Sequence, residues 1–142
     1  MEFAYNDWCI AQVSDELNNE NTTSEYLKRS ESYRNLYDSK IGFMRPKLNN
    51  GNWKTPFNAM DTHGQGFIEG NAWNYGLYVP HQIDTMIEMM GGKDRFSSKL
   101  DSLFDIEIEE KYIANTEDIT RDGIIGNYVH GNEPGHHKAQ VS

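Results

Sequence analysis

Seven consecutive residues, Glu69 to Tyr75, combine side chains that suit chemistry on a sugar. Glu69 is a lone carboxylate, and it is followed by a glycine, an amide and the aromatic rings of Trp73 and Tyr75. The apolar face of a sugar stacks on aromatic rings, and a carboxyl shielded from water keeps its proton long enough to act as an acid. The alternative is structural: Glu69 begins a helix, where the dipole favours a negative charge, and Trp73 packs inside. Because short motifs often match by accident, these residues alone favour the structural interpretation.

A second cluster of polar side chains extends from His130 to His137 and holds three histidines. It lacks both a cysteine ligand and the helical three-to-four-residue spacing of zinc ligands, which argues against zinc. The side-chain oxygens of Asn132 and Glu133, with nearby carbonyls, suit calcium better because calcium takes oxygen ligands in loose geometry. The structural alternative is that Asn132 caps a helix whose first turn contains Pro134.

Composition limits the class of protein. The chain has 142 residues, enough for one domain with a core and too few for two. Aromatic residues make up 12% of it, which argues against disorder. A formal net charge of -9 would repel nucleic-acid phosphates and anionic membranes, so we expect neither as a partner. The sequence contains no apolar run long enough to span a membrane, and its first residues do not have the pattern of a signal peptide.

Two amphipathic helices are predicted at the N-terminal end of the chain. Apolar residues recur at three-to-four-residue spacing over residues 3–17. The polar cluster 18–21 ends this helix, and Thr22 or Thr23 can cap a second one that continues to about residue 37. Two such helices joined by a short loop form an antiparallel hairpin, the repeating unit of all-helical folds.

The segment 42–57 breaks the helical pattern. Two prolines and an asparagine-rich cluster forbid a long helix, and Asn50-Gly51 is a signal for a short β-hairpin. We therefore predict an irregular β-hairpin excursion from the helical scaffold, of the kind that often lines a binding site. A loop at 58–66 follows, with three side chains that could contact a ligand or remain in solvent: Asp61, His63 and Gln65.

Helical periodicity returns in the second half of the chain. Apolar spacing predicts one helix from Glu69 through Leu77 and another over 83–90, which a glycine pair ends. Asp94 can cap a further helix. The run 105–122 is acidic and weakly periodic, so we predict a loop there. The sequence thus predicts an all-α fold with one excursion near 42–57.

Several stretches of the chain, in order, match the pattern of a known family. They are Ala-Tyr-Asn-Asp-Trp-Cys-Ile-Ala (4–11), Gly-Phe-Met-Arg (42–45), Glu-Gly-Asn-Ala-Trp-Asn-Tyr (69–75), Val-Pro-His (79–81), Met-Gly-Gly-Lys (90–93) and His-Gly-Asn-Glu-Pro-Gly-His-His (130–137). Together they resemble glycoside hydrolase family 92, a family of calcium-dependent, inverting, exo-acting α-mannosidases. The resemblance covers essentially the whole chain.

The resemblance implies a fold and a set of residue roles. The fold would be part of an (α/α)6 toroid built from helical hairpins. Glu69 matches the general acid that protonates the departing glycosidic oxygen, and Asn132 and Glu133 match the loop that holds Ca2+ against two mannose hydroxyls. Weaker candidates for contacts at the sugar or beside the calcium ion are His63, Trp73, His136 and His137.

The resemblance also implies that these residues are a fragment of a longer enzyme. An inverting enzyme needs a second carboxylate roughly 6.5–9.5 Å from the acid. In the family this base lies in a later Gly-Asn-Asp-Asp motif, which residues 1–142 do not contain; the family's N-terminal β-sandwich domain and the C-terminal part of the toroid are also absent. We therefore expect no hydrolysis from this chain alone.

Partners and location also follow from the resemblance. The family implies mannose-containing oligosaccharides or glycoproteins as substrates, and a periplasmic or extracellular location. The sequence predicts no oligomeric state. The alternative to an enzyme is a non-catalytic helical module that binds a glycan or calcium. Such a module would bind equally well without Glu69, whereas a catalytic domain needs Glu69 for turnover.

Overall fold

The computed structural model describes residues 1–113, 121–132 and 135–136. Its elements, in chain order, are the helices α1 (Glu2–Glu16) and α2 (Glu20–Ser30), the 3-10 helix η1 (Ser32–Leu36), the strands β1 (Tyr37–Asp38) and β2 (Phe43–Met44), the helices α3 (Ile83–Met89) and α4 (Lys93–Asp105), the 3-10 helices η2 (Glu110–Tyr112) and η3 (Arg121–Gly123), and the strands β3 (Ile124–Ile125) and β4 (Tyr128–Val129). Helices are the main regular structure of the described residues, and every strand among them is two residues long. A helical domain is therefore confirmed, whereas the toroid stays a prediction.

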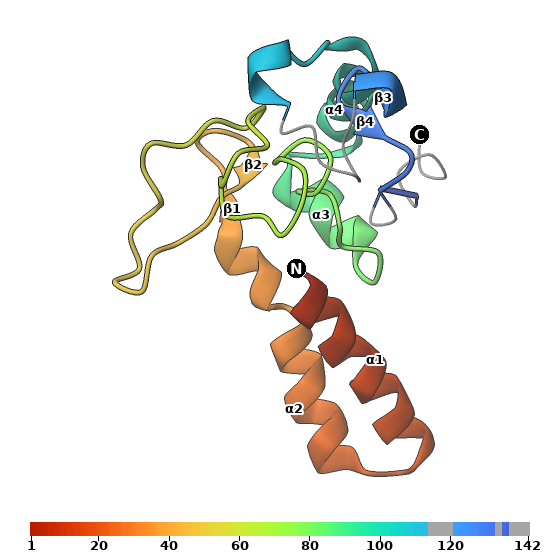
Figure 1. Ribbon diagram of the computed structural model, residues 1–142. Helices are drawn as coiled ribbons and strands as arrows, with labels where there is room; N and C mark the ends of the chain where they lie inside the picture. Colours follow the sequence, from red (N-terminus) through yellow and green to blue (C-terminus); the bar gives the residue numbers. More distant parts are fainter. Residues whose placement is uncertain (114–120, 133–134, 137–142) are drawn as a thin grey trace.

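The predicted N-terminal helical hairpin is confirmed, but its second helix is shorter than predicted. It ends at Ser30 and does not continue to about residue 37, since η1 and β1 follow it. Helices α1 and α2 run antiparallel, side by side, and project from the rest of the molecule (Figure 1). The cap of α2 differs from the prediction, because the side chain of Asn19 accepts a hydrogen bond from the backbone N–H of Thr22, at 3.3 Å. Thr22 therefore lies inside the helix as a donor, and Asn19, one of the residues best suited to capping, takes its place. Asp7 of α1 pairs with Arg29 of α2 at 3.1 Å.

The predicted β-hairpin excursion is also confirmed. Its paired strands, β1 and β2, come earlier in the sequence than the predicted Asn50-Gly51 turn. Strands β1 and β2 pair antiparallel, with Tyr37 opposite Met44. Beyond them an isolated antiparallel bridge joins Lys47 to Trp53 around the predicted Asn50-Gly51 turn. Gly51 has φ +82°, a conformation that glycine adopts without strain. Figure 1 shows this segment as a long loop that extends away from the helices.

The helix predicted from Glu69 through Leu77 is wrong. The segment consists of consecutive turns, and α3 begins only at Ile83. The side-chain oxygen of Asn71 accepts hydrogen bonds from the backbone N–H groups of Trp73 and Asn74, both at 3.0 Å, and that of Asn74 accepts from the N–H of Asn71. Asparagine side chains that form hydrogen bonds with nearby backbone groups compete with helix formation. In this segment their hydrogen bonds replace those of a helix.

Helices α3 and α4 pack a common apolar stripe into the core. The predicted helix at 83–90 is confirmed as α3, and the glycine pair that follows it has positive φ at both residues. The cap of α4 was predicted wrongly: Gly92 occupies the N-cap position and Asp94 lies in the first turn. The buried residues of the two helices are Met86, Met90, Phe96, Leu100 and Leu103.

One core cluster connects segments that are far apart in sequence. It contains Ala4 of α1, Met44 of β2, Trp73, Val79 and the buried stripe of α3 and α4. Tyr128 of β4 joins the same cluster. Within the described part of the chain, no helix is long and apolar enough to cross a membrane.

The turn between β3 and β4 lies directly against α4. The backbone N–H of Asn127 donates to the carbonyl of Leu103 at 2.7 Å. Gly126 has φ +61°, and a Cβ at this position would come within 2.3 Å of the carbonyl oxygen of Phe104. Only glycine fits such a close approach of two backbone segments, so Gly126 fixes the hairpin that precedes the histidine-rich segment.

Candidate active site

Glu69 lies at the start of the turns that replace the predicted helix. It is half-buried, between the exposed side chain of Ile68 and the buried Gly70. Gly70 has φ +64°, and a Cβ there would collide with the side-chain amide of Asn74. The two asparagines and this glycine therefore fix the backbone immediately after Glu69.

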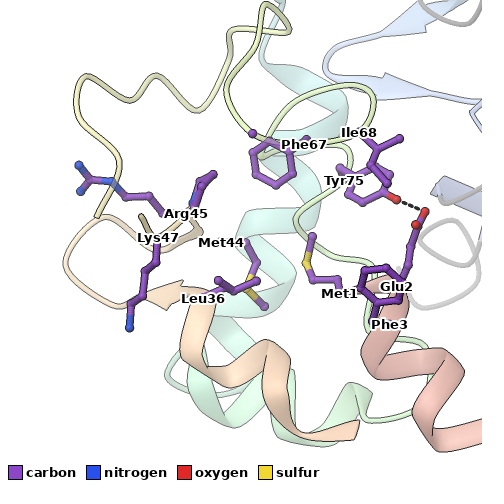
Figure 2. A pocket seen from close by; sticks show the side chains of 12 residues that line it. Met1, Glu2, Phe3, Leu36, Met44, Arg45, Lys47, Phe67, Ile68 and Tyr75 are labelled. Carbon is purple, nitrogen blue, oxygen red and sulfur yellow. Dashed lines mark hydrogen bonds between the residues drawn. The ribbon is translucent and has the colours of Figure 1, made fainter. Parts of the chain in front are cut away.

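Tyr75 interacts with two carboxylates, Glu2 and Glu69. Its hydroxyl donates a hydrogen bond to Glu2 of α1 (Figure 2). Burial is the largest cause that raises the pKa of Tyr75, followed by this hydrogen bond and by the negative charges of Glu2 and Glu69. Tyr75 therefore stays protonated at neutral pH and acts as a hydrogen-bond donor between two acidic side chains.

A cavity of about 280 Å³ opens beside this segment. Its walls are largely apolar and include Met1, Leu36, Met44, Phe67 and Tyr75 (Figure 2). Glu69 is not among the described residues that line it, although its neighbours Phe67 and Ile68 are. The candidate acid thus lies next to an apolar hollow that its own segment helps to form.

His63 and the two polar residues predicted with it form one cluster in the loop. The Nδ1 atom of His63 lies 2.9 Å from a carboxylate oxygen of Asp61, and Gln65 donates to the other oxygen at 2.9 Å. Burial acts to raise the pKa of Asp61, but the hydrogen bonds from His63 and Gln65 outweigh it and hold this pKa below its usual value. His63 itself is exposed, so its ring is accessible to a ligand.

Trp73 is a core residue in this structure. Only 8% of it is exposed, and its ring meets Phe43 edge to face at a centroid distance of 4.9 Å. This position matches the structural interpretation of the 69–75 segment. A contact between Trp73 and a sugar stays a prediction.

Asn132 is the most unusual residue of the second cluster. It is 1% exposed, and within the described part of the chain neither its Oδ1 nor its Nδ2 atom has a hydrogen-bond partner. A buried amide without partners costs about 1–3 kcal/mol, a cost that a cation bound at Oδ1 would offset. Calcium prefers such oxygen ligands, so Asn132 fits the predicted metal site. Glu133 and His137 lie outside the described residues, and among the rest no group of three or more His, Cys, Asp or Glu side chains could hold a metal.

The histidines beside Asn132 contact one another. The Nε2 atom of His136 lies 2.8 Å from the carbonyl oxygen of His130, and the two rings are 5.1 Å apart. The hydroxyl of Tyr128 lies 2.9 Å from Nδ1 of His130. Tyr128 and Trp73 belong to the same core cluster. The 69–75 segment and the strand that precedes the histidine-rich segment therefore pack against one core.

Two features escaped the sequence analysis. Arg45 forms an ion pair with the buried Asp38 at 3.0 Å, and it also donates to the carbonyl of Lys54 and the hydroxyl of Thr55. This contact has no signal in the sequence. Lys99 lies on the buried side of α4, and here a signal existed, because its position three residues after Phe96 is on the apolar face of the helix.

Comparisons with known proteins agree with the resemblance. Residues 1–140 match the model of the glycosyl hydrolase family 92 catalytic domain. The GH92 α-mannosidase BT3965 of Bacteroides thetaiotaomicron is 38% identical with a TM-score of 0.84, over 99% of this chain and 18% of that one. A complex of BT3965 with mannoimidazole gives 36% identity and a TM-score of 0.82, over 99% of this chain and 19% of that one.

Two further relatives agree. The GH92 inverting mannosidase BT2199 of the same species is 34% identical with a TM-score of 0.76, over 94% of this chain and 19% of that one. An uncharacterized secreted glycosidase of Arthroderma benhamiae is 29% identical, over 81% of this chain and 17% of its own length. The chain thus spans about a fifth of the length of these relatives. It belongs to glycosyl hydrolase family 92 and corresponds to part of that family's catalytic domain.

Proposed function

We propose that this chain is part of the catalytic domain of an inverting, exo-acting α-mannosidase, with Glu69 as its general acid. The observation that carries the proposal is the 38% identity to a solved α-mannosidase along 99% of the chain. A second solved relative is described as an inverting mannosidase. The substrates would be mannose-containing glycans, because a mannose-like ligand, mannoimidazole, is bound in a structure of the first relative.

The chemistry assigned to the described residues is limited. Glu69 would hold a proton and deliver it to the departing glycosidic oxygen, while the hydrogen-bonded turns after it keep its backbone in place. An inverting reaction also needs a carboxylate base on the opposite face of the sugar, roughly 6.5–9.5 Å away. We assign the base to no residue of this chain.

We also propose a calcium site in which Asn132 is a ligand. Its buried Oδ1 atom, which has no partner among the described residues, would be one ligand, and Glu133 is proposed as a second. When bound, the ion would polarise and orient mannose hydroxyls at the site. We also propose that the protein is secreted, because one relative is described as secreted.

The first prediction tests the function by transplanting the chain. In a chimera, this chain replaces the matching segment of the Bacteroides thetaiotaomicron α-mannosidase, which has a similar backbone over 99% of the chain. We expect the purified chimera to hydrolyse an aryl α-mannoside, and the isolated chain to be inactive. A chimera that unfolds as cooperatively as the parent enzyme but shows no hydrolysis would contradict the proposal, and so would activity of the isolated chain.

A second prediction concerns calcium. The Asn132→Leu variant keeps the side-chain volume and removes the Oδ1 ligand, so the chimera that carries it should need at least about tenfold more calcium for half-maximal thermal stabilisation. The same substitution at Asn52, an exposed residue, is the control and should leave the calcium dependence unchanged. Equal calcium dependence of all three proteins would exclude Asn132 as a ligand.

A further inference from the structure

A second pocket lies between the β1–β2 turn and the junction of α3 and α4, and it shares no lining residue with the cavity beside Tyr75. Its volume is also about 280 Å³. Its polar lining comes from Tyr37, Ser39, Arg95 and Lys99, and the rest of the lining is Gly42, Met89, Met90 and Gly91. Two of these side chains are cationic, and none of the described residues that line the pocket is acidic.

Lys99 is the deeper of the two cations. Its ammonium donates to the carbonyl of Gly42 at 3.1 Å and lies over the rings of Phe43 and Trp73, at 2.9 Å and 4.2 Å from their centroids. Within the described residues no carboxylate lies within ion-pair distance of it. Burial without a charged neighbour lowers the pKa of Lys99 to about 7. A buried lysine in this state gains most from a negative charge brought next to it.

Arg95 supplies the second positive charge from the same helix, one turn before Lys99. Its aliphatic stem lies over Gly91, where a Cβ would come within 2.9 Å of the Arg95 Cδ atom. Burial raises the pKa of Tyr37, and the positive charge of Arg95 acts in the opposite direction, so the two side chains interact electrostatically across the pocket that both of them line. Arg95 lies in the first turn of α4, and the positive end of the helix dipole therefore adds to the same field.

We propose that this pocket binds a small oxyanion, held between Lys99 and Arg95 with the hydroxyls of Tyr37 and Ser39 as further donors. The chain carries a net charge of -9, which repels anions in general. A local pair of cations without a carboxylate counter-charge is therefore a feature that a bound anion explains. The proposal does not depend on the mannosidase function.

The test uses sulfate as the probe, because sulfate does not titrate near neutral pH. In the 142-residue chain with 13C-labelled lysine, the ε-carbon shift of Lys99, assigned with Lys99→Met, reports its ionisation. At matched ionic strength, 10 mM sulfate in place of chloride should raise the titration midpoint of Lys99 by at least about 0.5 pH, since a bound anion favours the charged form. The other lysines should not move.

Two variants make the result specific. Arg95→Gln, at an exposed position that leaves the core intact, should reduce the sulfate effect at Lys99 by at least about half. Lys93→Gln removes an exposed charge from the same helix outside the pocket and should leave the effect unchanged. An unchanged Lys99 midpoint, an equal movement of all lysines, or no response to Arg95→Gln would each overturn the proposal.

Discussion

Replacing Glu69 by glutamine in the chimera is expected to lower the rate of α-mannoside hydrolysis by about 10²–10⁴-fold. Glutamine has nearly the same shape but no acidic proton to transfer to the leaving group, and general acid catalysis contributes a factor of this size. The binding of mannose-like inhibitors should change little, because the loss falls on proton transfer to the leaving group. The measurement is kcat and KM with an aryl α-mannoside, on a variant whose thermal unfolding matches that of the unsubstituted chimera.

The leaving group distinguishes an acid from a merely structural carboxylate. A dinitrophenyl group departs with little protonation, so the Glu69→Gln variant should lose far less activity on a dinitrophenyl mannoside than on an alkyl mannoside. The control is Glu88→Gln, an exposed carboxylate on α3, which should be neutral on both substrates. Equal losses on the two substrates would assign Glu69 a structural role and exclude it as the general acid.

The parts of the fold that were predicted correctly are those that depend on residues close together in the sequence. The α1–α2 hairpin follows from periodic apolar residues and a polar turn, and the excursion near 42–57 follows from prolines and Asn50-Gly51. The helix expected from Glu69 failed for an equally local reason. Apolar spacing there was helical, but Asn71 and Asn74 bind the backbone of their own segment, and their hydrogen bonds outcompeted the helix.

The candidate site was predicted by residue type and not by geometry. Nothing in the sequence indicated that Asn132 would be buried with no partner among the described residues, or that Tyr75 would bind Glu2, which is 73 residues before it. These contacts depend on how distant segments meet in the core, which periodicity does not encode. The ion pair of Asp38 and Arg45 was missed for another reason, because it depends on the β1–β2 pairing, which was not predicted at these residues; its expected effect on stability is large.

Replacing Arg45 by methionine is expected to lower the free energy of unfolding of the chain by about 3–5 kcal/mol. The side chains of Asp38 and Arg45 are 5% and 15% exposed, so the substitution leaves a buried carboxylate without its partner. It also removes three hydrogen bonds that tie the excursion at Lys54 and Thr55 to the β1–β2 turn. Urea unfolding, followed by tryptophan fluorescence and circular dichroism, measures the loss.

Two comparisons separate the buried charge from the loss of an arginine in general. Arg34→Met removes an ion pair with Glu31 in which both side chains are at least 44% exposed, and it should cost no more than about 1 kcal/mol. In the double variant Asp38→Asn/Arg45→Met the orphaned charge is gone, so the chain should recover part of the stability lost by Arg45→Met alone. If Arg45→Met were as mild as Arg34→Met, water would reach Asp38 easily, and the excursion would be held in place by contacts other than its buried ion pair.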